Sequence, residues 1–408
     1  MLEVIAKHLY RRGMPESEVV IVGGCGHVGL PFGLVLAGNG ISTIALDIDS
    51  EKIENVSHGN MPFMEEGAEA LLKQVLSKGT FRVTTEATCI RTAKYVIFVI
   101  GTPVDEHLSP NPNSVINAIF ELKDFLVDGQ TIILRSTLFP GVAKKVLYEI
   151  SKVFPSTKVV YCPERIVEGQ AIEELRTLPQ IVGSESEEAS DSAKSLFDRI
   201  GVECVFGSFE EAELSKLFTN VWRYVKFATA NQFWMMSNDL GVDYERVKKL
   251  MSYGYQRAAD LPSAGLTAGP CLFKDTMQLS ALVQQNFPLG NAAMMINEGT
   301  PGYIVNRLKK QYNLRETKVG ILGVAFKANV DDIRSSLAFK LKKLLEFESA
   351  GVLLTDPYVV DHRLVGLERV MSECDVLILC APHTVYQSLS TNKRVIDIWG
   401  FFGQGVIV

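Results

Sequence analysis

The sequence predicts an α/β protein with two doubly wound parallel sheets joined by a long central helix. Three observations support this fold class. Strand-like apolar runs recur in two sets of four, and the second run of each set ends in an acidic residue, Asp47 or Asp356. Between the sets, about 30 residues keep a helical apolar spacing with neither glycine nor proline.

The strand predictions come from continuous runs of valine, isoleucine and leucine, which suit strands buried on both faces of a sheet. The intervals between runs are long enough for crossover helices, so each set predicts a Rossmann-like unit. The first set is VVIVGG (19–24), ISTIALD (41–47), YVIFVIGTP (95–103) and TIILRST (131–137). The second is KVGILGVAFK (318–327), GVLLTDP (351–357), DVLILCAP (375–382) and RVIDIWG (394–400).

The central helix begins at SFEE, where Ser208 can cap the helix and Glu211 can return the hydrogen bond. A helix of about 30 residues is about 45 Å long and can bridge two domains. Its apolar stripe predicts packing or a dimer interface rather than a ligand site. The stripe consists of Leu214, Leu217, Phe218, Val221 and Val225.

Length and composition set the wider limits. The 408 residues exceed what one core fills, and we expect three domains at 1–205, 206–300 and 301–408, of which the middle one is helical. The net charge of −6 argues against nucleic acid or an anionic membrane as partner. Seven scattered cysteines without a CxxC motif suit the reducing cytoplasm, and six dispersed histidines offer no metal site.

A dinucleotide site is predicted after the first strand, at GGCGHVG (23–29), which opens a helical pattern. Its glycines let a pyrophosphate approach the helix N-terminus. The loop residues expected there are Gly24, Gly26, His27, Val28 and Gly29.

Asp47, at the end of the second strand, can accept hydrogen bonds from both ribose hydroxyls and would repel a 2′-phosphate. The sequence therefore favours NAD as the cofactor. The nearby cation Lys52 would tolerate that phosphate and leaves NADP as the alternative.

Seven segments, in their order and spacing, resemble the UDP-glucose/GDP-mannose dehydrogenase family of nucleotide-sugar 6-dehydrogenases over nearly the whole chain. They are GCGHVGLP (24–31), GTP (101–103), STLFPG (136–141), CPERIVEGQA (162–171), AELSKLFTN (212–220), GPCLFKD (269–275) and LGVAFKANVDDIRSS (322–336). The resemblance implies that a UDP-sugar C6 alcohol is oxidised to a carboxylate with two NAD per turnover.

The same resemblance implies the catalytic roles. Cys271 attacks the intermediate aldehyde and later carries a thioester, and Asp275 takes part in proton transfer. Lys216 holds the developing oxyanion, and Asn220 shares its helix face because it lies four residues further on. Glu164 activates the hydrolytic water that Thr137 positions.

Further family contacts fall on named positions of this chain, and they imply a site shared by the two nucleotide-binding domains. Arg257 matches the arginine that is lent to a neighbouring subunit, so a homodimer is implied. The cofactor contacts are Thr102, Thr137, Glu168, Lys274 and Arg334, and the substrate contacts are Glu164, Arg165, Ile166, Lys216, Asn220, Arg257, Phe326 and Lys327.

The resemblance leaves two classes of UDP-sugar as candidate substrates. PERIVEG resembles the UDP-N-acetylhexosamine branch (ManNAc or GlcNAc), which we favour, whereas CLFKD resembles the UDP-glucose branch. A two-electron 3-hydroxyacid-type dehydrogenase is a lower alternative because it explains neither the second Rossmann-like unit nor Cys271. A non-catalytic protein that binds NAD or UDP-sugar is another, since Pro270 stiffens the loop before Cys271.

Overall fold

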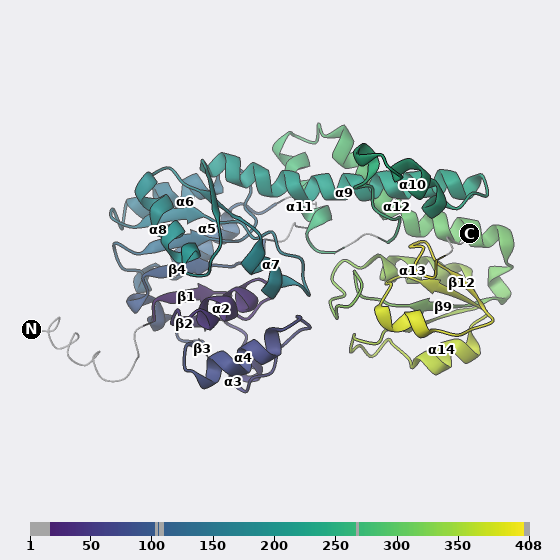
Figure 1. Cartoon of the computed structure of the whole chain (residues 1–408), viewed down its shortest axis with the longest axis horizontal. Coiled ribbons are helices and arrows are strands. Elements are labelled where there is room, and N and C mark those ends of the chain that lie inside the picture. Colours follow the sequence, from purple (N-terminus) through teal and green to yellow (C-terminus); the bar gives the residue numbers. More distant parts are fainter. Residues whose placement is uncertain (1–16, 103–104, 106–109, 267–268, 404–408) are drawn as a thin grey trace, which may run out of the picture. The chain divides into compact units, whose positions relative to one another are not determined.

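The computed structural model describes residues 17–102, 105, 110–266 and 269–403. The polar stretch 1–16, Pro103, Thr267 and Ala268 lie outside them. The chain forms two compact units, residues 1–216 and 217–408 (Figure 1). The three-domain division at 205/206 and 300/301 stays a prediction.

The first unit contains an eight-stranded sheet in the order β3-β2-β1-β4-β5-β6-β7-β8. Strands β1 to β6 pair in parallel, whereas β7 meets β6 antiparallel at one residue pair, Tyr161 and Gly183. Four of these strands confirm the predicted runs: β1 (Val19–Val22), β2 (Thr43–Leu46), β4 (Tyr95–Phe98) and β5 (Thr131–Leu134). The others were not predicted: β3 (Phe81–Thr84), β6 (Lys158–Tyr161), β7 (Gln180–Gly183) and β8 (Cys204–Gly207).

Helices cover both faces of this sheet, so alternate residues of the central strands enter different cores. Val19 and Ile21 join one core, and Val20 and Val22 join the other. The first core is completed by α2 (Gly29–Gly38), α4 (Ala68–Ser77), α7 (Ala171–Thr177) and α8 (Glu187–Asp198), and the second by α5 (Asn113–Glu121) and α6 (Val142–Ser151). Helix α3 (Ser50–Ser57) and the 3₁₀ turns η1 (Ala87–Thr92) and η2 (Lys123–Phe125) complete the connections.

The long helix is α9 (Phe209–Asp239), with 31 residues, and it confirms the predicted length. The predicted capping box is present: the Glu211 amide donates to Ser208 Oγ at 3.2 Å, and the Ser208 amide donates to Glu211 Oε2 at 2.7 Å. Leu217 and Val221 of the predicted stripe are buried, whereas Phe218 is 55% exposed. The apolar residues of α9 therefore divide between a buried face and an exposed one.

The second unit has helices first and a sheet after them. The helices are α10 (Tyr244–Ser252), η3 (Gln256–Ala258), α11 (Leu272–Leu282), α12 (Pro288–Gln311) and η4 (Leu314–Glu316). The sheet is parallel, in the order β10-β9-β11-β12, and all four strands were predicted: β9 (Lys318–Leu322), β10 (Gly351–Thr355), β11 (Val376–Leu379) and β12 (Arg394–Ile396). Helices α13 (Leu337–Glu348) and α14 (Leu367–Glu373) pack on its opposite faces, and η5 (Thr384–Ser388) follows β11.

Within the described part of the chain, no helix combines the length and the hydrophobicity that crossing a membrane requires.

Candidate active site

The glycine loop after β1 forms the cradle that a dinucleotide phosphate needs. A Cβ at Gly29 would lie 2.5 Å from the Gly23 carbonyl oxygen and 2.9 Å from Gly24 Cα, so only glycine fits where α2 begins. A Cβ at Gly26 would meet nothing closer than 3.8 Å, which leaves that side of the loop open. Val28 caps α2 without a side-chain hydrogen bond, so the helix N-terminus keeps donors for an anion.

Asp47 directly follows β2 and is tied to the same loop. Its Oδ2 accepts a hydrogen bond from the Cys25 amide at 2.9 Å, and its Oδ1 accepts one from the Asp49 amide at 3.2 Å. The residue is half-buried, and each carboxylate oxygen accepts one of these bonds, so further lone pairs remain for a ribose. Lys52 lies on α3, where its Nζ pairs with Asp49 Oδ2 at 3.1 Å.

Two further predicted cofactor residues contact each other across the first unit. The His27 ring stacks on Phe63 with centroids 4.0 Å apart, and its Nδ1 lies 3.9 Å from Glu168 Oε2. His27 is on the glycine loop and Glu168 follows β6, so two distant segments of sequence meet here.

The loops after β4 and β5 are joined by hydroxyl groups. Thr102 Oγ1 donates to the Thr137 carbonyl oxygen at 3.0 Å, and Ser136 Oγ accepts from the Ile100 amide at 2.7 Å. Parallel strands end at one edge of a sheet, and ligands of open α/β sheets bind along that edge. Gly24, Asp47, Thr102, Thr137 and Glu164 all follow strands that end there.

Arg135 is a buried cation at this edge that the sequence analysis does not identify. It follows β5 and is 2% exposed. Its guanidinium pairs with Glu164, donates to Gln180 Oε1 at 2.8 Å and to the Cys162 carbonyl oxygen at 3.3 Å, and lies 4.0 Å from the centroid of the Phe32 ring. The cation thereby connects the ends of β5, β6 and β7.

Glu164 is held on both carboxylate oxygens. Its Oε2 accepts from Arg135, and its Oε1 accepts from the backbone amides of Arg165 at 2.6 Å and Ile166 at 2.9 Å. Arg165 in turn donates to the Pro179 carbonyl oxygen. The carboxylate therefore shapes the segment after β6, and Oε2, which accepts one of these three hydrogen bonds, keeps a lone pair for a water.

Removing the Arg135 cation should destabilise the first unit strongly. Arg135→Met leaves Glu164 buried without a counter-charge, and we expect the free energy of unfolding to fall by about 3–5 kcal/mol. The double variant Arg135→Met/Glu164→Gln should recover most of this loss, as urea unfolding would measure. Arg199→Met is the matched control, because Arg199 pairs with Glu18 at the surface and should cost less than about 1 kcal/mol. An equal fall in the free energy of unfolding in Arg135→Met and in Arg199→Met would show that the Arg135 cation does not stabilise the buried Glu164.

Glu213 is a second buried residue that the sequence analysis does not identify. It lies on α9, fully buried, and accepts from the amides of Gly141 at 2.7 Å and Ala143 at 2.9 Å, at the start of α6. Burial raises the pKa of Glu213, and the two backbone donors offset part of that rise. The contact fixes the end of the Thr137 loop against the helix that carries Lys216, whose side chain is buried.

The second unit brings together three predicted catalytic residues, Cys271, Asp275 and Asn220, and one predicted cofactor contact, Lys274. Asp275 is fully buried on α11, where its Oδ2 accepts from Asn220 Nδ2 at 2.6 Å and its Oδ1 lies 3.3 Å from Lys274 Nζ. Cys271 immediately precedes α11, and its carbonyl oxygen accepts from the Asp275 amide at 2.9 Å. The thiol position and the buried carboxylate are therefore one helical turn apart.

Cys271 differs from the other six cysteines in its surroundings. It is exposed at a helix N-terminus, a place that favours a thiolate. Burial raises the pKa of each of the others, to about 12 for Cys25 and about 11 for Cys89 and Cys204. The same cause raises the pKa values of Cys162, Cys374 and Cys380. The exposed cysteine is thus the best placed nucleophile of the seven.

The loop before Cys271 contacts Phe326, one of the predicted substrate residues. Gly269 has a φ of +107°, and a Cβ there would lie 2.7 Å from the Phe326 ring, so the ring packs directly on the loop backbone. Lys327 follows, half-buried. Arg334 is exposed and pairs at 2.6 Å with Asp332, whose carbonyl oxygen accepts from the Phe326 amide at 2.9 Å. Arg257 is exposed on η3, with its guanidinium 5.5 Å from the centroid of the Tyr255 ring.

Three segments of the chain match the UDP-glucose/GDP-mannose dehydrogenase family. Residues 17–201 match its NAD binding domain, residues 210–299 its central domain and residues 320–404 its UDP binding domain. The first of these matches covers the glycine loop and Asp47, whose geometry fits NAD. The third covers the second sheet.

Individual proteins are similar over almost the full length. A UDP-N-acetyl-D-mannosamine dehydrogenase of Pyrococcus horikoshii is 27% identical over 91% of this chain and 91% of its own. An NDP-N-acetyl-D-galactosaminuronic acid dehydrogenase of Ralstonia nicotianae is 25% identical over 95% and 97%. A solved UDP-D-ManNAc dehydrogenase from Pyrococcus horikoshii superposes with a TM-score of 0.86 at 26% identity, covering 94% of this chain and 95% of the other.

The family match covers both predicted Rossmann-like units and the helical region between them, which a two-electron 3-hydroxyacid-type enzyme does not explain. The chain therefore belongs to the UDP-glucose/GDP-mannose dehydrogenase family and is an NAD-dependent nucleotide-sugar dehydrogenase.

Proposed function

We propose that the protein oxidises the C6 alcohol of a UDP-N-acetylhexosamine, with UDP-ManNAc as the favoured substrate, to the uronate in two successive two-electron steps. The observation that carries this proposal is the exposed Cys271 at the start of α11, one turn from the buried Asp275. A single oxidation of an alcohol needs no thiol. An aldehyde needs a nucleophile before it can lose a second hydride.

When bound, NAD supplies the hydride acceptor for both oxidations. Between them, Cys271 Sγ bonds to C6 of the aldehyde, and the aldehyde oxygen takes a proton to give a thiohemiacetal. Loss of the C6 hydride and the hydroxyl proton then gives a thioester. Water breaks the S–C6 bond, the thiol regains its proton, and the carboxylate leaves.

Asp275 is suited to move these protons because it is buried beside the thiol position and held by Asn220. A positioned acid or base of this kind contributes about 10²- to 10⁴-fold in rate. Lys274 Nζ lies 3.3 Å from Asp275 Oδ1 and so places a positive charge beside the carboxylate. Lys216, one turn before Asn220 on α9, supplies the cation for a developing oxyanion.

Two observations favour an N-acetylhexosamine over glucose. Arg165 directly follows Glu164, as in the segment PERIVEG that resembles the N-acetylhexosamine branch. The two relatives described above are named for ManNAc or N-acetylgalactosaminuronic acid. UDP-glucose is the alternative, on the CLFKD segment. Purified protein should therefore be assayed with UDP-ManNAc, UDP-GlcNAc and UDP-glucose, counting NADH per sugar consumed. We expect two NADH per sugar and the highest kcat/KM with UDP-ManNAc. One NADH per sugar, or binding of every sugar without turnover, would contradict the proposal.

Asp47 should set the choice between NAD and NADP. Its carboxylate follows β2, beside the glycine loop, where a 2′-phosphate would meet a negative charge. We expect kcat/KM with NAD to exceed that with NADP by at least about 100-fold, and Asp47→Ser to reduce this ratio at least about tenfold. Asp49→Ser is the control, because Asp49 caps α3 and pairs with Lys52 instead. An unchanged ratio in Asp47→Ser would show that this carboxylate does not discriminate.

The exposed face of α9 supports a homodimer. At 100° per residue, its four large exposed apolar residues fall within an arc of about 60°. A narrow apolar stripe on one helix face is the pattern that a second copy covers. The four residues are Phe218, Trp222, Phe233 and Met236, and Trp222 is 57% exposed.

A charge in this stripe should separate the two copies. Trp222→Glu is expected to convert the dimer to a species of one 45.1 kDa chain in analytical ultracentrifugation. Phe347→Glu, at an 89% exposed position of α13 away from the stripe, should leave the mass unchanged. A dimer that persists in Trp222→Glu, or a monomeric unaltered protein, would reject this interface.

A further inference from the structure

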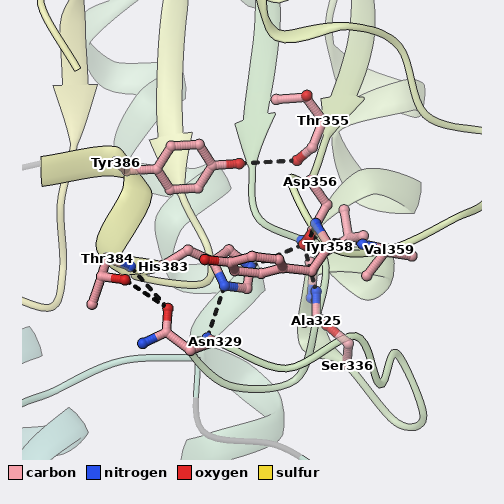
Figure 2. Close-up of polar contacts among 12 residues, drawn as sticks. Ala325, Asn329, Ser336, Thr355, Asp356, Tyr358, Val359, His383, Thr384 and Tyr386 are labelled. Atoms are coloured by element: carbon pink, nitrogen blue, oxygen red, sulfur yellow. Dashed lines mark hydrogen bonds and ion pairs between the residues drawn. The ribbon is translucent and has the colours of Figure 1, made fainter. Parts of the chain in front are cut away.

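The carboxylate of Asp356, at the end of β10, accepts hydrogen bonds from four backbone amides and one histidine of the protein. Asp356 has a fully buried side chain, and its Oδ2 accepts from the amides of Val324 at 2.7 Å and Ala325 at 3.1 Å and from His383 Nε2 at 3.0 Å. Its Oδ1 accepts from the amides of Tyr358 at 2.9 Å and Val359 at 3.1 Å (Figure 2). Asp47, at the corresponding position of the first sheet, accepts one backbone hydrogen bond on each carboxylate oxygen, from Cys25 and Asp49. The acid of the second sheet is therefore an anchor for loops and not a ribose ligand.

His383 connects this anchor to a second loop. It follows β11, is fully buried, and has both ring nitrogens engaged. The Asn329 amide donates to Nδ1 at 2.9 Å, so the ring proton lies on Nε2 and is donated to Asp356. The rings of Tyr358 and Tyr386, 5.0 and 5.7 Å from His383, enclose the imidazole (Figure 2).

Asn329 holds a backbone conformation that its own partners stabilise. Its φ is +57°, in the left-handed region. Its Oδ1 accepts from the Thr384 amide at 2.9 Å and lies 3.2 Å from Thr384 Oγ1. The loop after β9 is therefore joined to the loop after β11 by two contacts, one through the His383 ring and one through this amide.

These contacts clamp a short segment at both ends. Asp356 holds the amides of Val324 and Ala325, and His383 holds the amide of Asn329, so Phe326, Lys327 and Ala328 lie between two fixed points. This segment lies at the carboxyl edge of the sheet, where ligands of α/β sheets bind, within the part that matches the UDP binding domain.

We infer that His383 is a positioning residue for the nucleotide: its Nδ1 fixes Asn329 and thereby the Phe326-Lys327 segment that contacts the UDP moiety. This inference rests on the proposed function. His383 itself is buried and does not touch the ligand. It holds the loop in the binding conformation before the ligand arrives, so less conformational entropy is lost when UDP binds.

Two variants separate the two ring nitrogens. An asparagine Oδ1 is as many bonds from Cα as His383 Nδ1, so His383→Asn keeps an acceptor for the Asn329 amide. A glutamine Nε2 corresponds to His383 Nε2, so His383→Gln keeps the donor to Asp356 and loses that acceptor. If the acceptor positions the loop, the two variants should differ in UDP affinity.

The test is calorimetric titration of the full-length protein with UDP and, separately, with NAD. We expect His383→Gln to weaken UDP binding at least about tenfold and His383→Asn to stay within about threefold of the unaltered protein, with NAD affinity unchanged in both. The KM for the sugar nucleotide should rise in His383→Gln while kcat is kept. UDP binding that is equal in the two variants, whether retained or lost, would overturn the inference. Loss of UDP binding in a folded His383→Asn protein would overturn it even if His383→Gln does not fold. Because UDP binding is measured directly, failure to oxidise any UDP-sugar would count against the proposed function and not against this role.

Discussion

Cys271→Ser is expected to lose at least about 10³-fold in the rate of uronate formation, because a hydroxyl is a far weaker nucleophile than a thiolate at the start of α11. The first oxidation does not need the thiol, so the variant should still form NADH slowly, at no more than one per sugar. Product analysis by mass spectrometry together with NADH counting measures both effects. Binding of UDP and NAD should be unchanged.

Cys204→Ser is the matched control for this experiment. Cys204 is a half-buried cysteine of β8, and burial raises its pKa to about 11. The Cys204→Ser protein should therefore keep the full rate of uronate formation. Unchanged uronate production by Cys271→Ser would remove the thiol from the mechanism, whereas an equal loss in both variants would indicate a general effect of cysteine replacement.

Asp275→Asn is expected to reduce kcat by about 10²- to 10⁴-fold, the usual contribution of a positioned acid or base. The replacement keeps the size of the side chain but removes the charge that faces Lys274 at 3.3 Å. It also presents an amide group to Asn220 Nδ2, which now lies 2.6 Å from a carboxylate oxygen. Proton transfer should fail while the KM for NAD stays unchanged.

Asp260→Asn offers a close comparison. Asp260 also lies 3.3 Å from a lysine, Lys226, but its side chain is 66% exposed, so its loss should leave kcat within about twofold. Steady-state kinetics of the two variants, with thermal unfolding as a check on folding, distinguish burial at the site from simple loss of an ion pair. Full activity of a folded Asp275→Asn protein would contradict the assigned role.

The elements that sequence predicts well are those whose signals are local. The capping box at Ser208 lies within four residues, and the eight predicted strands are apolar runs that need no partner to be identified. Asp47 ends a predicted strand, so its place at the carboxyl edge of the sheet follows from the sequence, whereas Glu164 follows β6, which was not predicted.

What the sequence does not show are contacts between residues far apart in the chain. Arg135 and Glu164 are 29 residues apart, Glu213 and Ala143 are 70 apart, and His383 and Asn329 are 54 apart. Charged residues are mostly exposed, so a single sequence does not distinguish a buried, paired charge from one at the surface. Strand β8 escapes prediction for another reason: it is a short edge strand with Val205 and Phe206 half exposed, so it has no buried run to identify.

The covalent intermediate on Cys271 is the central claim, and the mass of the peptide that contains Cys271 tests it most directly. Protein turning over UDP-ManNAc and NAD would be quenched in acid at a series of times and digested. We expect part of this peptide to carry the mass of the oxidised sugar nucleotide, in a form that hydroxylamine removes, as a thioester requires. Release of two NADH per sugar while the Cys271 peptide keeps its unmodified mass at every quench time would contradict the account.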